Sequence, residues 1–221
     1  MLRRVLVLLE RSELGLEPNE SKRMIVLSVP RCGATAFAMA YAEELGVPFF
    51  GEMSCFMNDD YQPGFALQKR RFHEAGINCQ PTRTAREFYL DLKNSHKGVW
   101  LANPAVDCTP ILPFADKIIL RKNVVDSVGS LLEIIQLEFG HENYPHWAQD
   151  RVDALIKNHS IMLDWSYHTE FPIFWYEDCF PGMTRSYDIS ALGMNLTEIT
   201  APYLEKYKIS EKMTLLGVDF A

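Results

Sequence analysis

The segment RMIVLSVPRCGATAFAMAYAEELG, residues 23–46, constrains the fold of this chain more than any other. It begins with MIVLSV, a continuous apolar and β-branched run that ends at Pro30, which is typical of a strand buried on both faces. It ends with TAFAMAYAEELG, an alanine-rich run that predicts a helix with Gly46 as its C-cap. The tight loop between them contains one arginine, one glycine and one threonine, and no lysine. The segment therefore predicts a strand–loop–helix unit of a parallel sheet.

Further apolar runs and helical patterns alternate along the rest of the chain. Because alternating strands and helices require right-handed crossovers, we expect a three-layer α/β/α fold with a central, mainly parallel sheet. Apolar content is spread along the chain, and no segment resembles a polar linker, so residues 1–221 are predicted to form one domain. The expected elements are strands at 47–52, 98–104, 116–123 and 171–179, and helices at 66–76, 84–92, 124–140, 143–169 and 195–210.

Charge, cysteine content and hydropathy exclude several classes of protein. The net charge of −7 argues against a nucleic-acid partner, because nucleic-acid binding needs a basic face. The five cysteines contain no C-x-x-C pair, which favours reduced, buried thiols and gives no sign of a metal site. The run VLVLL near the first residue is too short for a signal peptide or a bilayer span. We therefore expect a cytoplasmic protein with no stable membrane insertion.

The loop after the first predicted strand has the chemistry of an anion site. It leads into a helix N-terminus, where unpaired N–H groups and the helix dipole favour negative charge. Gly33 allows close approach of a ligand oxygen, Arg31 supplies a full charge and Thr35 a hydroxyl group. The loop lacks the lysine of nucleoside-triphosphate loops and the glycines of dinucleotide sites. It suits a phosphate or a sulfuryl group, and the alternative is an ordinary turn between strand and helix.

A second candidate anion site follows a later strand. In DKIILRKNVVDSVGSLLEI, the adjacent cations Arg121 and Lys122 follow a buried run, and Asp126 and Ser130 lie on the next predicted helix. Cations at the end of a strand, with a serine about two turns into the helix, can hold a second phosphate. The alternative is a solvated strand end.

Three segments together resemble the sulfotransferases. VPRCGATAF is similar to the phosphosulfate-binding loop of that family, P-[RK]-[SG]-G-[ST]-T, and LRKNVVDSVGSLL is similar to its second motif. FWYEDC resembles the Y-E-D segment that the family carries on a late strand, although its two acidic residues are expected to cap the next segment. The segments occur in family order over residues 24–179. The resemblance, which is greatest to bacterial-type carbohydrate sulfotransferases, implies a fold like that of P-loop NTPases.

The resemblance also implies a reaction. The family transfers the sulfuryl group of 3′-phosphoadenosine 5′-phosphosulfate (PAPS) to an acceptor and releases adenosine 3′,5′-bisphosphate (PAP), without a metal. It implies a small-molecule or glycan acceptor, with a hydroxyl of a carbohydrate or glycolipid as the expected target. Ser130 would bind the 3′-phosphate, together with Lys122, eight positions earlier, or with Arg121 after a small shift. The residues implied to bind the 5′-phosphosulfate are Arg31, Cys32, Gly33, Ala34, Thr35 and Ala36.

The catalytic base is expected to be a carboxylate near the acceptor hydroxyl. Glu52 is the first candidate, because the bacterial enzymes that this chain resembles have a catalytic glutamate after their second strand; the alternative is a surface glutamate. Asp107 is the second candidate, and His141 is the best placed of the histidines. Ala102 and Asn103 stand where many family members have a lysine and an acidic residue. Because of those departures, either Arg31 takes over the role of the missing lysine, or the activity is lost.

Two other functions stay open. A P-loop kinase acting on a small molecule would need a lysine that the first loop lacks. A non-catalytic protein that kept a nucleotide-binding fold is favoured by the departures at Ala102 and Lys122. The sequence indicates neither the acceptor nor an oligomeric state.

Overall fold

The structure is a computed structural model of the chain, and it divides into two compact units. The first unit contains the described residues up to 28, those from 33 to 102, and 111–118. The second contains 29–32, 107–109 and the described residues from 119 onward. The single domain expected over 1–221 stays a prediction. The described residues are 23–52, 98–102, 107–109, 111–139, 148–183, 187, 189, 192, 193 and 195–219.

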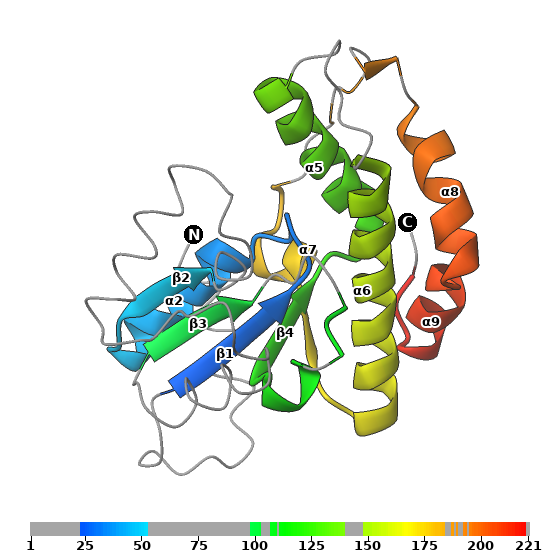
Figure 1. Cartoon of the computed structure of the whole chain (residues 1–221). Coiled ribbons are helices and arrows are strands. Elements are labelled where there is room, and N and C mark those ends of the chain that lie inside the picture. The colour runs from blue at the N-terminus through cyan, green and yellow to red at the C-terminus, as the bar shows by residue number, and fades with distance from the viewer. Residues whose placement is uncertain are drawn as a thin grey trace, which may run out of the picture. The chain divides into compact units, whose positions relative to one another are not determined.

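The described elements form an α/β fold with a parallel sheet, as the sequence predicts (Figure 1). The strand order is β2-β3-β1-β4-β5. β3 pairs in parallel with both β1 and β2, and Arg23 of β1 lies opposite Gly98 of β3. The strands are β1 (Arg23–Ser28), β2 (Phe49–Glu52), β3 (Gly98–Ala102), β4 (Lys117–Leu120) and β5 (Ile173–Trp175).

The first unit has its core between helix α2 (Ala34–Leu45) and strands β1 and β3. Small side chains on the buried face of α2 let the helix approach the strands, and Phe37 fills the space that remains. All of β3 is buried, which fits the continuous apolar run from which it was predicted. Fully buried side chains of this core include Ile25, Val26, Leu27, Phe37, Val99, Trp100 and Leu101.

The C-terminus of α2 confirms the predicted glycine cap. Gly46 has a left-handed backbone, with φ of 62°, and its N–H donates to the carbonyls of Ala42 and Glu43. A residue with a side chain adopts this conformation only at a cost, so the glycine ends the helix cleanly.

The second unit is built around the long helix α6 (Ala148–Thr169), which packs against three other helices. Lys212, on one of these helices, binds to α6 directly, because its Nζ lies 2.6 Å from Oδ2 of Asp164. Three thiols of this unit, Cys32, Cys108 and Cys179, are free and buried, as expected. Burial raises the pKa of Cys108 to about 12 and that of Cys179 to about 11. The other helices are α5 (Val124–Phe139), α7 (Tyr176–Cys179), α8 (Leu196–Lys206) and α9 (Ile209–Leu215).

Several predicted boundaries differ from the structure. The strand expected at 171–179 ends at Trp175, and the Y-E-D segment begins the short helix α7, in which Phe180 N–H donates to Tyr176 O at 2.8 Å. The helix expected at 195–210 is two helices, because Lys208 has a left-handed backbone, with φ of 54°, that interrupts the helical turn. The short 3-10 helix at Leu112–Phe114 was not predicted from the sequence. The helices expected at 66–76 and 84–92 lie outside the described residues.

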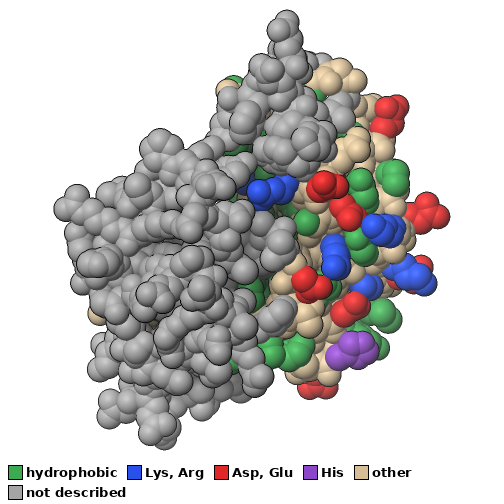
Figure 2. Space-filling view, viewed as in Figure 1, with side chains coloured by type: hydrophobic (Ala, Val, Ile, Leu, Met, Phe, Trp, Pro, Cys, Tyr) green, Lys and Arg blue, Asp and Glu red, His purple; other side chains and the backbone are tan. Residues whose placement is uncertain are grey.

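The described surface of the second unit mixes charges of both signs. Figure 2 shows acidic and basic side chains interspersed over the face that α6, α8 and α9 form. Pairs such as Lys206 with Asp153 account for part of this pattern. Within the part of the chain that the structure describes, no helix combines the length and the apolar character needed to cross a membrane.

Candidate anion-binding site

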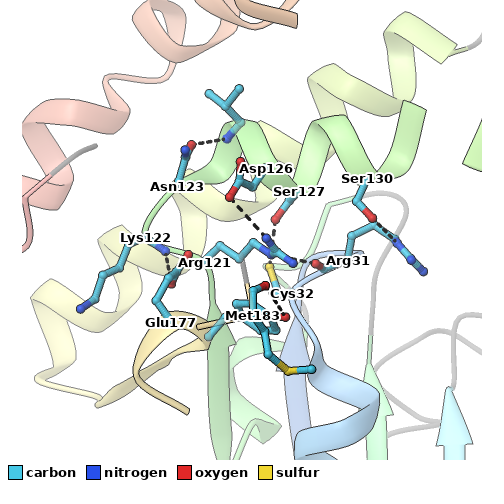
Figure 3. A network of polar contacts seen from close by, with 12 residues as sticks. Arg31, Cys32, Arg121, Lys122, Asn123, Asp126, Ser127, Ser130, Glu177 and Met183 are labelled. Carbon is cyan, nitrogen blue, oxygen red and sulfur yellow. Dashed lines mark hydrogen bonds and ion pairs between the residues drawn. The ribbon is translucent and has the colours of Figure 1, made fainter. Parts of the chain in front are cut away.

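Parts of the three segments that resemble sulfotransferase motifs meet in one polar network of the second unit (Figure 3). Arg31 Nε donates to Ser130 Oγ at 3.0 Å, across 99 positions of sequence. Arg121 Nε donates to the carbonyl of Arg31 at 3.1 Å. The N–H of Lys122 donates to Oε2 of Glu177 at 2.9 Å. Residues that follow β1, β4 and β5 are therefore in direct contact, as expected for the carboxyl ends of neighbouring parallel strands.

Arg31 is exposed and has an unusual backbone. Its φ is 70°, in the left-handed region that residues other than glycine rarely adopt. Such a conformation costs about 1–3 kcal/mol and persists only where surrounding contacts hold it, often at a functional site. Among the described residues, the Nη atoms of Arg31 have no partner. Within the described part of the chain, the arginine thus has its Nη donors and its charge available to a ligand.

The start of α2, in the first unit, continues the loop. Gly33 is the N-cap residue and has a left-handed backbone, with φ of 68°. No side chain caps this helix, and its first turn contains no acidic residue. Thr35 and Ala36 are exposed, whereas Ala34 is buried. The N-cap residue therefore offers no side chain to the first N–H groups of α2, and no carboxylate of the first turn offsets the positive end of the helix dipole.

Cys32 does not contribute its side chain to this surface. The residue is fully buried, and its Sγ lies 3.3 Å from Oγ of Ser127. Only the backbone of Cys32 can take part in binding an anion.

Arg121 turns inward. Only 6% of the residue is exposed, its Nη1 lies 3.5 Å from Oδ2 of Asp126, and its guanidinium lies 4.1 Å from the ring centroid of Tyr176. Its Nε also donates to the Arg31 carbonyl, so the Arg121 guanidinium contacts three other residues of the protein. Its position fits a residue that organises the loop as well as one that binds a ligand.

Lys122 has an acidic partner at both its backbone and its side chain. Its Nζ lies 2.6 Å from Oδ1 of Asp178, in a pair that is about half exposed to solvent. Figure 3 shows its side chain extending away from the Arg121 guanidinium. Glu177, which accepts the Lys122 N–H through one oxygen, has its other oxygen buried with no hydrogen-bond partner within the described part of the chain. Glu177 and Asp178 contact Lys122 through their side chains, and their expected role as caps of the next segment stays a prediction.

The N-terminus of α5 is closed by its own residues. Asn123 Oδ1 accepts from the N–H of Val125 at 3.0 Å, and the Asn123 carbonyl accepts from the N–H of Asp126. Asp126 adds a carboxylate to the first turn. Desolvation raises the pKa of Asp126, the Arg121 charge lowers it, and the nearby Glu177 raises it further.

Gly129, beside Ser130, is explained by packing that the sequence did not reveal. A Cβ on Gly129 would lie 2.8 Å from the Tyr187 ring and 3.0 Å from a methyl group of Leu196. Glycine lets these side chains approach α5 next to Ser130, of which only 4% is exposed.

The two candidate bases, Glu52 and Asp107, lie in different surroundings. Glu52 is the last residue of β2, at the predicted strand end, and its Cα lies opposite Leu101. Asp107 is exposed and accepts from the Thr109 N–H at 2.8 Å and from Lys157 Nζ at 3.2 Å. Those hydrogen bonds lower the pKa of Asp107, chiefly through Thr109, which makes it a weaker base.

None of the other residues considered near the acceptor is a strong candidate for the base. Ala102 is buried at the end of β3, whereas Asn103 and His141 lie outside the described residues. His159 of α6 is fully buried, neither of its ring nitrogens has a hydrogen-bond partner within the described part of the chain, and burial lowers its pKa to about 3. Burial keeps its ring away from any substrate and the low pKa makes it a weak base, so His159 is not a candidate for the catalytic base.

The contacts of the acidic residues of α7 with Lys122 are the part of this network that the sequence analysis missed. A signal was present: an acidic pair follows the last predicted strand, a cationic pair follows the strand before it, and neighbouring parallel strands bring such ends together. Searches against protein-family models, curated proteins and solved structures found no match to this chain.

Proposed function

We propose that this chain is a PAPS-dependent sulfotransferase with a three-layer, P-loop-like fold, which transfers a sulfuryl group to a hydroxyl of a carbohydrate or glycolipid. The observation that carries the proposal is the 3.0 Å hydrogen bond between Arg31 Nε and Ser130 Oγ. It joins two segments that resemble the two phosphate-binding motifs of that family and lie 99 positions apart. This contact supports one binding site that both motifs share.

The 5′-phosphosulfate of the donor lies, in this proposal, against Arg31 and the first N–H groups of α2. Support comes from the left-handed backbone at Arg31 and Gly33, because alternating backbone handedness forms concave sites for anions. Support also comes from the helix start that no side chain caps. Thr35, exposed in the first turn, adds a hydroxyl donor.

The 3′-phosphate lies near Ser130 and the turn after β4. Ser130 Oγ accepts from Arg31, so its own hydrogen can still be donated to a phosphate oxygen. Arg31 stands between the two phosphate positions and can bridge them through its Nη atoms. This arrangement supports a nucleotide with two separate anionic groups over one with a single triphosphate tail.

The reaction is an in-line displacement. The acceptor oxygen attacks sulfur, the bond from sulfur to the 5′-phosphate oxygen breaks, and the acceptor proton passes to a carboxylate. PAP leaves with the electron pair, and Arg31 neutralises the charge that develops on its phosphate. Glu52 is the proposed base because it ends the strand next to β3; Asp107 is second, since its hydrogen bonds lower its pKa.

The proposal includes a cellular location for the protein and a class of acceptor. A cytoplasmic location is supported by the free, buried thiols at Cys32, Cys108 and Cys179. The net charge of −7 supports a small-molecule or glycan acceptor over a nucleic acid.

A non-catalytic nucleotide-binding protein is the second candidate. One observation favours it: β3 ends in the buried Ala102, where many members of the family have a lysine that helps the reaction. Such a protein would bind PAP and turn over no acceptor.

Thermal shift separates these functions. We expect PAP and PAPS to raise the melting temperature and ATP with magnesium to leave it unchanged; the reverse pattern would indicate a kinase. Turnover of PAPS is then measured on a panel of glycans with the wild type and Glu52→Gln. Loss of turnover with unchanged PAP binding in the variant supports the proposed base. Binding without turnover on any acceptor supports the second candidate.

A further inference from the structure

The short helix α7 contacts both cations that follow β4. The Tyr176 ring packs under the Arg121 guanidinium at 4.1 Å, Glu177 accepts the Lys122 N–H at 2.9 Å, and Asp178 pairs with Lys122 Nζ at 2.6 Å. Three consecutive residues of α7 thus contact the backbone and the side chains of the two residues that follow β4. A segment with a purely local role, such as a helix cap, has no need of such a set of contacts.

Arg121 carries this constraint on to the first loop. Its Nε donates to the carbonyl of Arg31, which fixes the peptide plane between Arg31 and Cys32. That plane borders the residue whose φ is 70°. A left-handed backbone at a residue with a side chain needs contacts on both sides to persist, and here they are Arg121 at the carbonyl and Ser130 at the side chain.

Arg31 differs from Arg121 and Lys122 in how its charge is paired. Lys122 is paired with Asp178, and Arg121 is paired with Asp126 and packed on Tyr176. Within the described residues, Arg31 has no carboxylate partner. An incoming anion therefore meets Arg31 as a full charge and meets Arg121 and Lys122 largely neutralised.

We propose that Tyr176, Glu177 and Asp178 are positioning residues, which hold Arg121 and Lys122 as internal anchors and, through Arg121, fix Arg31 as the cation that contacts the ligand. This assignment rests on the proposed function for the identity of the ligand. It changes the expected roles of Arg121 and Lys122 from phosphate ligands to supports of the loop. It also gives the Y-E-D segment a function, which is to join the ends of β4 and β5.

A first experiment needs no ligand. Hydrogen exchange of arginine Nε–H groups is measured by nitrogen-15 NMR on the full chain, for the wild type, Glu177→Ala and Glu205→Ala. Glu205 is an exposed glutamate on α8 and serves as the matched control. We expect slow exchange at Arg31 and Arg121 in the wild type, since both Nε–H groups donate hydrogen bonds. Exchange at both sites should accelerate at least tenfold in Glu177→Ala and stay unchanged in the control.

A second experiment measures PAP affinity by calorimetry, well below the melting temperature of each variant. Glu177→Ala is expected to bind PAP about tenfold more weakly, and Glu177→Gln, which keeps an acceptor for the Lys122 N–H, should recover most of the loss. Arg121→Lys keeps the charge but loses the Nε donor and the flat surface packed on Tyr176, so it should also bind about tenfold more weakly.

The outcomes are distinguishable. Unchanged exchange at Arg31 and Arg121 in Glu177→Ala overturns the positioning role, whatever binds. Wild-type affinity in Arg121→Lys with loss in Arg121→Ala also overturns it, because Arg121 would then act as a charge on the ligand. Faster exchange in Glu177→Ala with no PAP binding by the wild type supports the positioning role and removes the sulfotransferase proposal alone.

Discussion

Two helices of this protein, α2 and α5, begin just after strands that neighbour each other in the sheet, yet their N-termini differ. α2 starts at a left-handed glycine, has no side-chain cap and has no acidic residue in its first turn. α5 starts at Asn123, whose side chain and carbonyl accept two of its first N–H groups, and it carries Asp126 in the first turn. The cap residue of α2 offers its first N–H groups no side chain, whereas Asn123 satisfies two of the first N–H groups of α5.

The same difference holds for the cations beside each helix. Arg31, before α2, has no carboxylate partner among the described residues, whereas Arg121 and Lys122, before α5, are each paired with one. A helix N-terminus is therefore not an anion site by position alone. It becomes one when the sequence leaves out the acceptors that would otherwise fill it.

The largest effect is expected at Arg31. Arg31→Ala removes the uncompensated charge and should weaken PAP binding about 10- to 100-fold, the range expected for hydrogen bonds to a charged group. Calorimetric titration measures the change, and Arg151→Ala on α6 removes an equal charge as a control. Wild-type PAP affinity in Arg31→Ala would show that the loop before α2 is not the anion site, and the contrast between the starts of α2 and α5 would then have no functional meaning.

The backbone at Arg31 gives the second prediction. Arg31→Gly and Arg31→Ala remove the same guanidinium, but only glycine adopts a φ of 70° without strain. The glycine variant should be more stable than the alanine variant by about 1 kcal/mol in free energy of unfolding, measured by urea denaturation. Equal stabilities would mean that the loop relaxes out of the left-handed conformation once the side chain is gone.

Asp178 tests whether the second cation pair is held in check. Asp178→Asn leaves Lys122 without its ion-pair partner and weakens its hold on the turn after β4, so PAP affinity should fall about two- to fivefold at low salt, in line with the worth of a partly exposed ion pair. The loss should shrink at high ionic strength, where salt already screens the pair. Asp219→Asn, at another exposed aspartate, controls for the change in net charge. A rise in affinity would show that Asp178 only neutralises Lys122 and does not position it.

The smallest effect concerns the acid at the start of α5. Because the folded pKa of Asp126 is raised above 3.8, the folded state keeps this proton to higher pH than the unfolded state does. Its stabilising contribution is present below pH 3.8 and is lost as the pH rises through the folded pKa. Relative to Asp126→Asn, the wild type should therefore lose a little stability over that window, as measured by urea denaturation across pH. A change in the opposite direction would mean that the Arg121 pair outweighs desolvation.

The sequence predicted the elements whose signals are local. The buried run before Pro30, the alanine-rich helix and the glycine at 46 each report on their immediate surroundings, and β1, α2 and its cap lie where they were expected. The two candidate anion sites also lie at the ends of the predicted strands. Parallel topology makes that outcome general, because it collects such ends at one edge of the sheet.

What the sequence did not reveal depends on contacts between distant residues. The inward orientation of Arg121 needs the carbonyl of Arg31, 90 positions away, and the ring of Tyr176. From the sequence alone, Gly129 is only an unfavourable residue inside a helix. The structure explains it, because the Tyr187 ring packs against this position. The left-handed φ of Arg31 has no local signature, since arginine does not favour it.

The central claim is that Arg31 and the start of α2 bind the 5′-phosphate of an adenosine 3′,5′-bisphosphate. A crystal structure of the protein with saturating PAP tests it most directly. We predict 5′-phosphate oxygens within hydrogen-bonding distance of the Arg31 Nη atoms and of the N–H groups between Gly33 and Ala36, with the 3′-phosphate at Ser130. PAP bound elsewhere, or no PAP in the crystal while Arg31 keeps its bond to Ser130, would contradict the account.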